Sequence, residues 1–142
     1  MFIKNRTYFD TLRLDIIGLV DTGNNKILDI GCGTGRTSSL LKERGKAIET
    51  VGIEKDFEAA EKAKEIMDHV ICADIEHFKL PFDKEYFDYI ILGDILEHLY
   101  DPWVLVDKLV DFLKVNGYVV ASIPNVRNIL VIYNLLFRKD WQ

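Results

Sequence analysis

A glycine-rich segment, Asp29-Ile30-Gly31-Cys32-Gly33-Thr34-Gly35, is the part of this sequence best suited to holding a ligand. Glycines let the backbone turn tightly and approach a ligand closely. The helix expected after them would aim free N–H groups at the same place, which favours a carboxylate or phosphate. The spacing is G-x-G-x-G and not the dinucleotide G-x-G-x-x-G, so it argues against NAD. The alternative is a tight turn without a ligand.

Two carboxylates follow at places where a nucleoside could be held. Glu54, with Lys55 after it, ends an apolar run about 20 residues beyond the glycines, and can accept hydrogen bonds from both hydroxyls of a ribose. Asp74 ends the next apolar run and can accept from an exocyclic amine such as that of adenine. Each has a simpler interpretation: Glu54 as a solvated loop acid and Asp74 as a helix N-cap.

Asp94, Glu97 and His98 form a third group, spaced at i, i+3 and i+4. If Asp94 begins a helix, the three side chains share one face. His98 could then remove a proton from an acceptor hydroxyl, because its ordinary pKa lies near neutrality. The trio could instead hold a divalent metal. The third interpretation is structural: capping by Asp94 and local hydrogen bonds by Glu97 and His98.

The elements that must position these residues alternate between strands and helices. Short apolar runs predict strands, and helical periodicity between them predicts helices. Crossover connections of this kind require a parallel sheet with helices on both faces, so the fold class is α/β, doubly wound. We expect strands at 26–30, 47–53, 70–73, 86–92 and 118–123, and helices at 8–20, 37–44, 57–67, 102–114 and 126–138.

Composition limits the partners. The chain has 142 residues, 49% of them hydrophobic, which suits one domain over residues 1–142. A net charge of -5 argues against nucleic acid, because phosphate binding needs clustered Lys and Arg. No apolar stretch is long enough to span a membrane, and no secretory signal is recognisable, so we expect a cytoplasmic protein. The two cysteines, Cys32 and Cys72, are expected to be reduced, buried thiols.

The glycine segment with Ile27-Leu28 before it, Glu54, Asp74 and the run from Phe87 to Leu99 together resemble the class I S-adenosylmethionine-dependent methyltransferases. The resemblance spans nearly the whole chain and implies a Rossmann-like fold. It also implies that S-adenosylmethionine and its product S-adenosylhomocysteine bind. The residues that it assigns to the cofactor are Asp29, Gly31, Cys32, Gly33 and Gly35 near the methionine moiety, Glu54 and Lys55 near the ribose, Asp74 and Ile75 near adenine, and Gly93 under the sulfonium.

The same resemblance bears on the acceptor. The run Ala121-Ser122-Ile123-Pro124-Asn125 is similar to members that modify small molecules and sugars, and the Asn-Pro-Pro-aromatic signature of DNA amino-methyltransferases is replaced by Gly93-Asp94-Ile95-Leu96. A small-molecule acceptor is therefore expected, with His98 and Asp94 as candidate catalytic residues. Tyr8 and Phe9 are expected either to cover the cofactor as a lid or to pack as an ordinary aromatic pair.

Family members continue beyond the fifth strand to two further strands, so we expect a C-terminally truncated chain that lacks this strand pair. The strand at 118–123 would then be a sheet edge beside an apolar helix at 126–138, which favours a homo-oligomer. Two other functions stay open. One is a nicotinamide-dependent oxidoreductase, and the other is a scaffold that binds the cofactor without turnover.

Overall fold

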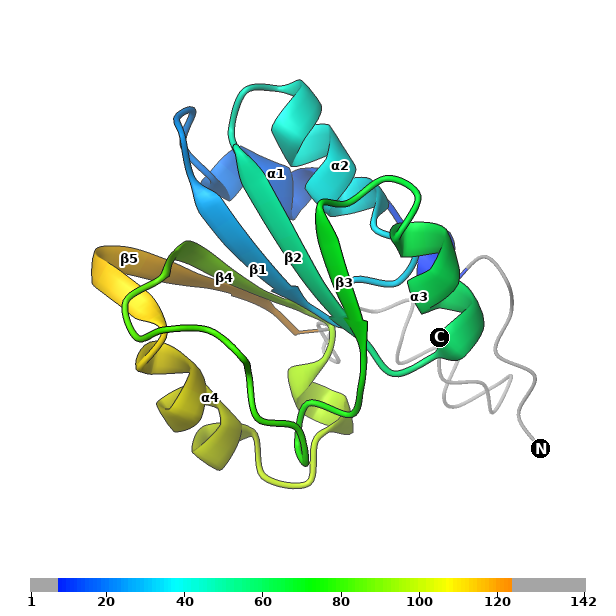
Figure 1. The fold of residues 1–142 in the computed structure, drawn as a ribbon, viewed down its shortest axis with the longest axis vertical. Coiled ribbons are helices and arrows are strands. Elements are labelled where there is room, and N and C mark those ends of the chain that lie inside the picture. The colour runs from blue at the N-terminus through cyan, green and yellow to red at the C-terminus, as the bar shows by residue number, and fades with distance from the viewer. Residues whose placement is uncertain (1–7, 124–142) are drawn as a thin grey trace, which may run out of the picture.

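The computed structural model describes residues 8–123 and shows a sheet of five parallel strands flanked by helices (Figure 1). The sheet has the order β3-β2-β1-β4-β5, so successive strands are added outward on one side of β1 and then on its other side. The α/β, doubly wound fold is therefore confirmed. The strands are β1 (Lys26–Ile30), β2 (Glu49–Glu54), β3 (His69–Cys72), β4 (Phe87–Gly93) and β5 (Leu113–Ser122). The helices are α1 (Leu14–Leu19), α2 (Arg36–Glu43), α3 (Phe57–Ala63) and α4 (Pro102–Val110), with 3₁₀ turns η1 (Tyr8–Asp10) and η2 (Leu96–His98).

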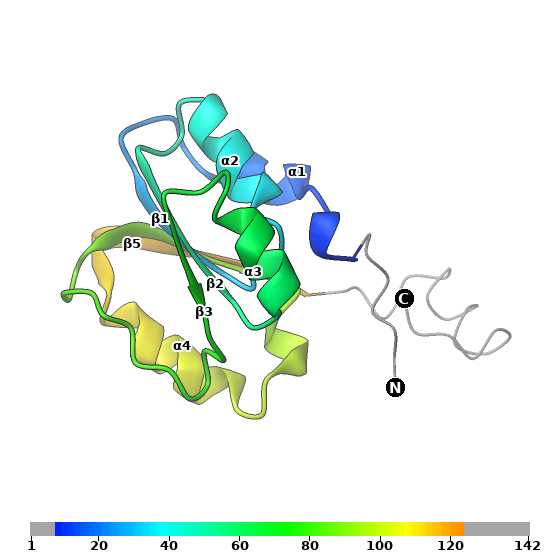
Figure 2. The same ribbon diagram turned by 45° about the vertical axis from the view of Figure 1, so that its right-hand side comes forward.

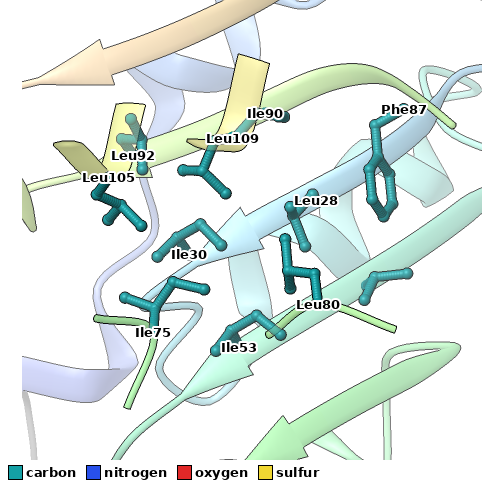
Figure 3. Close-up of a cluster of buried hydrophobic side chains, with 11 residues drawn as sticks. Leu28, Ile30, Ile53, Ile75, Leu80, Phe87, Ile90, Leu92, Leu105 and Leu109 are labelled. Atoms are coloured by element: carbon teal, nitrogen blue, oxygen red, sulfur yellow. The ribbon is translucent and has the colours of Figure 1, made fainter. Parts of the chain in front are cut away.

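The helices cover the sheet from both sides, with α1, α2 and α3 on one face and α4 on the other (Figures 1 and 2). Side chains alternate across a strand, so β1 supplies both faces. Leu28 and Ile30 pack into the cluster that includes Leu105 and Leu109 of α4, and Figure 3 shows these side chains meeting between strand and helix. Ile27 packs on the opposite face with residues of α1 and α2. Burial on both faces explains the nearly continuous apolar runs of the central strands β1 and β4.

The segment before the sheet differs from the predicted helix over 8–20. The structure has η1, then an extended connection, then the six-residue α1. The main-chain oxygen of Phe9 accepts hydrogen bonds from the N–H and the hydroxyl of Thr34, at 3.0 and 3.1 Å. Because these bonds tie η1 to the glycine segment, the chain is interrupted where an uninterrupted helix was predicted.

The predicted helix over 102–114 was also too long. It ends at Val110, and β5 begins at Leu113, so Asn116-Gly117 lies inside the strand and not in a turn before it. The register of β5 against β4 shifts between Phe87 and Tyr89, which accommodates the extra residues as a bulge. Lys114 is held in the strand by its ion pair with Asp88 at 2.9 Å. The spacing of apolar residues at the end of the predicted helix suits a helix and a strand equally, so it did not indicate where the helix ends.

The expectations for the two cysteines and for membrane-spanning segments can also be compared with the structure. Cys32 is buried, as predicted, but Cys72 is exposed, because it ends β3 at the edge of the sheet. Within residues 8–123, no helix is both long and apolar enough to cross a bilayer. The helix predicted over 126–138 and any later strand pair lie outside the described residues, so the homo-oligomer built on them stays a prediction.

Candidate functional site

Nine of the ten predicted cofactor residues line a cavity of about 350 Å³. It lies where β1, β2 and β4 end and where the chain leaves β3, the edge at which parallel α/β sheets bind ligands. Asp94 and His98 also line it. Gly35 does not, because it caps α2 and faces the side chain of Met67. The predicted cofactor residues on the cavity wall are Asp29, Gly31, Cys32, Gly33, Glu54, Lys55, Asp74, Ile75 and Gly93.

The N–H groups of the glycine segment, residues 31–35, are occupied within the protein. Those of Gly31 and Cys32 donate to the main-chain oxygen of Ile53 at 2.7 and 3.2 Å. The Gly33 N–H donates to the Glu54 carboxylate at 2.9 Å. Thr34 and Gly35 donate to the main-chain oxygens of Phe9 and Cys32. These five groups are therefore not available to a ligand anion. The free N–H groups expected from the helix that follows are a different set, and that expectation stays a prediction.

The glycines are needed because other atoms come close. Gly33 has φ +56, and a Cβ there would lie 2.5 Å from the main-chain oxygen of Phe9. Gly31 has φ +73, and its Cβ would lie 2.9 Å from the Ile95 side chain. Positive φ is strained for residues with a side chain. The segment thus serves to seat η1 and the residues after β4 around the cavity.

Glu54 is buried and not a solvated loop acid, with 7% of its surface exposed. One carboxylate oxygen accepts from the Gly33 N–H and the other from the Asp56 N–H, both at 2.9 Å. A carboxylate has about four acceptor positions, so two remain for a ligand at the cavity wall.

Asp74 lies in a turn and does not cap a helix. Its carboxylate accepts from the Lys55 ammonium at 2.8 Å and from the Glu76 N–H at 3.2 Å. The hydrogen bond from Lys55 is the main reason why the pKa of Asp74 is lowered. Asp74 is therefore a charged acceptor at the β3 end of the cavity.

Asp29 joins β1 to α2. Its buried carboxylate accepts from the Ser38 hydroxyl at 2.7 Å. Burial raises the pKa of Asp29 to about 6; the Ser38 hydrogen bond opposes this rise and the charge of Glu54 adds to it. A ligand with a positive group would favour the ionised form of Asp29.

An ion pair that sequence reasoning missed closes the β4 end of the cavity. The Arg13 guanidinium pairs with the Asp94 carboxylate, whose other oxygen accepts from the Ser122 hydroxyl at 3.0 Å. The Arg13 N–H donates to the Thr37 hydroxyl at 3.2 Å. Arg13 and Asp94 are separated by 81 positions, and no local pattern in the sequence indicates such a pairing.

Asp94 does not begin an α-helix. Its backbone has φ +52, and only the short η2 follows, so Asp94, Glu97 and His98 do not share a helix face as predicted. His98 lines the cavity, and its Nε2 lies 3.9 Å from a Glu97 carboxylate oxygen. Between residues 8 and 123 there is no group of three or more His, Cys, Asp or Glu side chains arranged to hold a metal ion. The metal interpretation of the trio thus finds no support in this geometry.

The N-terminal aromatic pair is only partly described. Phe9 lines the cavity, and its main chain is bound to the glycine segment through Thr34. The side chain of Tyr8 lies outside the described part of the structure. A covering role for Phe9 is consistent with this position and stays a prediction.

Comparison with known proteins gives concordant matches. The profile of a family described as a methyltransferase domain matches residues 28–121. A demethylmenaquinone methyltransferase of Staphylococcus aureus is 32% identical over 80% of this chain and 50% of its own length. A ubiquinone biosynthesis O-methyltransferase of Bradyrhizobium diazoefficiens is 29% identical over 72% of this chain and 41% of its own.

A solved structure shows the same fold. The S-adenosylmethionine-dependent methyltransferase of Archaeoglobus fulgidus superposes with a TM-score of 0.72 at 23% identity, covering 97% of this chain and 62% of that one. The chain spans about half the length of the curated relatives it matches.

Proposed function

Because the chain belongs to the class I S-adenosylmethionine-dependent methyltransferases, we propose that it transfers a methyl group from S-adenosylmethionine to a small-molecule acceptor. The family binds S-adenosylmethionine and S-adenosylhomocysteine. When bound, the cofactor supplies a methyl group already activated by its sulfonium. The protein then has to align donor and acceptor and accept a proton where the acceptor carries one.

The observation that carries this proposal is the chemistry of the cavity wall. Its acceptors are the carboxylates of Glu54, Asp74 and Asp29, which suit ribose hydroxyls, an exocyclic amine and an ammonium group. The glycine-segment N–H groups that a pyrophosphate would need are bonded internally. These residues fit S-adenosylmethionine better than a nicotinamide dinucleotide.

At the other end of the cavity, His98 would act on the acceptor. His98 lines the cavity together with Asp94, and the Glu97 carboxylate lies 3.9 Å from its Nε2. His98 could take a proton from an acceptor hydroxyl as the methyl group is transferred. The two curated relatives are named for demethylmenaquinone and for ubiquinone biosynthesis, so hydroxylated quinone precursors are the first acceptors to test.

Binding comes first in the experiment. S-adenosylhomocysteine should raise the melting temperature of the full chain, and NAD should not, because only a ligand of the folded state stabilises it. Tighter binding of NAD than of S-adenosylhomocysteine in calorimetry would refute the proposal.

Transfer is then followed with S-adenosylmethionine labelled in its methyl group and a panel of hydroxylated quinone precursors. His98→Gln should lower the labelling rate about 100-fold, the usual range for a general base, while the affinity for S-adenosylhomocysteine is unchanged. Cofactor affinity without any labelled acceptor would favour the scaffold, since a fold does not by itself fix an activity.

A further inference from the structure

The guanidinium of Arg13 lies on the cavity wall next to Gly93. A Cβ built on Gly93 would be 3.9 Å from Arg13 Nη1, and both residues line the cavity. The Arg13 side chain is only 20% exposed, so its charge is not fully screened by water. A partly buried guanidinium therefore lies at this end of the cavity.

The order of the strands indicates which part of the cofactor meets that charge. The cavity runs from Asp74 after β3, past Glu54 at the end of β2 and Gly31 after β1, to Gly93 at the end of β4. If Asp74 and Glu54 hold the nucleoside, as the proposed function requires, the sulfur lies toward β1 and β4. Arg13 is then near the sulfonium, and two positive charges at close range repel each other.

Three carboxylates counter the charge of Arg13. The Asp15 hydrogen bond is the largest of the interactions that raise the pKa of Arg13, and Asp94 and Glu97 raise it further. Asp15 and Asp94 both form ion pairs with Arg13, but of these two only Asp94 lines the cavity. Asp94 is in turn fixed by Ser122, whose hydroxyl donates to it and whose main-chain oxygen accepts from its N–H at 3.1 Å.

We propose that the Arg13–Asp94 ion pair sets how strongly the protein distinguishes S-adenosylmethionine from S-adenosylhomocysteine. The two molecules have the same nucleoside, amino and carboxylate groups, and they differ by the methyl group and the positive charge on sulfur. Asp94 offsets the repulsion that Arg13 would exert on the sulfonium, so it favours the charged substrate. Arg13 has the opposite effect and favours the neutral product. This inference rests on the proposed function.

The test is the ratio of the two dissociation constants, measured by calorimetry at low salt on the full chain. In Asp94→Asn the affinity for S-adenosylmethionine should fall about three- to tenfold relative to that for S-adenosylhomocysteine, as expected for one charge in a partly exposed site. In Arg13→Gln the ratio should move by a similar factor in the other direction. If the ion pair were merely structural, replacing either partner would weaken the binding of both ligands by the same factor.

Two control variants separate charge from structure. Ser122→Ala removes a hydrogen bond to Asp94 without changing any charge, so the ratio should stay at the parent value. Asp15→Asn removes a carboxylate that lies off the cavity wall, so it should shift the ratio less than Asp94→Asn does.

The ratio also separates this inference from the proposed function. A ratio that is unchanged in both Asp94→Asn and Arg13→Gln, with both ligands still bound, would overturn the inference alone. Failure of the parent chain to bind either ligand would overturn the proposed function and the inference with it.

Discussion

The Glu54 carboxylate accepts a hydrogen bond of 2.9 Å from the N–H of Gly33, and so joins the end of β2 to the glycine segment after β1. The second carboxylate oxygen accepts from the Asp56 N–H, just before α3. One buried side chain therefore fixes two loops of the cavity. A substitution at Glu54 should therefore affect both loops.

Glu54→Gln is expected to weaken the binding of S-adenosylhomocysteine and to destabilise the fold. The amide keeps one acceptor oxygen, so either the Gly33 or the Asp56 N–H loses its partner, at about 1–3 kcal/mol. Binding should weaken by a similar amount, because the acceptor for the ribose also changes. Calorimetry and urea unfolding measure the two effects.

The control for Glu54→Gln is Glu65→Gln, which changes an exposed acid and should alter neither quantity. Full affinity and full stability in Glu54→Gln would show that this carboxylate does not support the site.

Gly33→Ala should cost more stability than Gly45→Ala. Both glycines have positive φ, +56 and +67, so both changes carry the backbone strain of about 1–2 kcal/mol. A Cβ at residue 33 would also meet the main-chain oxygen of Phe9 at 2.5 Å, whereas nothing lies within 4 Å of one at residue 45. The clash should add about 1–3 kcal/mol, measured by urea unfolding. Equal losses in the two variants would mean that η1 moves away freely.

The two cysteines should differ in reactivity. Cys32 is buried, and burial raises the pKa of its thiol, so almost no reactive thiolate forms. Cys72 is exposed. An aromatic disulfide reagent should therefore titrate one thiol in the folded protein and two in urea. Cys72→Ser should abolish the fast reaction. If a fast reaction persists in Cys72→Ser, the glycine segment opens more readily than the structure indicates.

The sequence is informative about this site where the backbone itself imposes a requirement. The alternating glycines must follow a strand, and apolar runs buried on both faces predict a parallel sheet, so the positions of Gly31, Glu54 and Asp74 at strand ends could be inferred. Hydrogen-bond partners could not be. The N–H groups of Gly31 and Thr34 donate to Ile53 and Phe9, which lie in distant parts of the chain and belong to no local pattern.

The end of β4 was the least predictable part. The spacing of Asp94, Glu97 and His98 suits an α-helix, but Asp94 adopts positive φ when it pairs with Arg13 and Ser122. Those partners come from the N-terminal segment and from β5, so tertiary contacts override the local pattern. The same holds for Lys114, which the ion pair with Asp88 keeps in β5.

Asp29→Asn should stabilise the protein at neutral pH and weaken its binding of the cofactor. The pKa of Asp29 is raised from 3.8 to about 6, so the folded state binds this proton more tightly than the unfolded state does. Its contribution to the free energy of unfolding is therefore present below pH 4 and is lost as the pH rises to about 6, by about 3 kcal/mol at most. Asparagine removes that loss and still accepts a hydrogen bond from Ser38.

Thermal unfolding of both proteins from pH 4 to 8 should show a difference in the free energy of unfolding that is near zero at pH 4, grows with pH and levels off above pH 6. S-adenosylhomocysteine should bind the variant more weakly at pH 8, because its ammonium group loses a carboxylate partner. A stability difference that does not change with pH would show that Asp29 keeps an ordinary pKa in the folded protein.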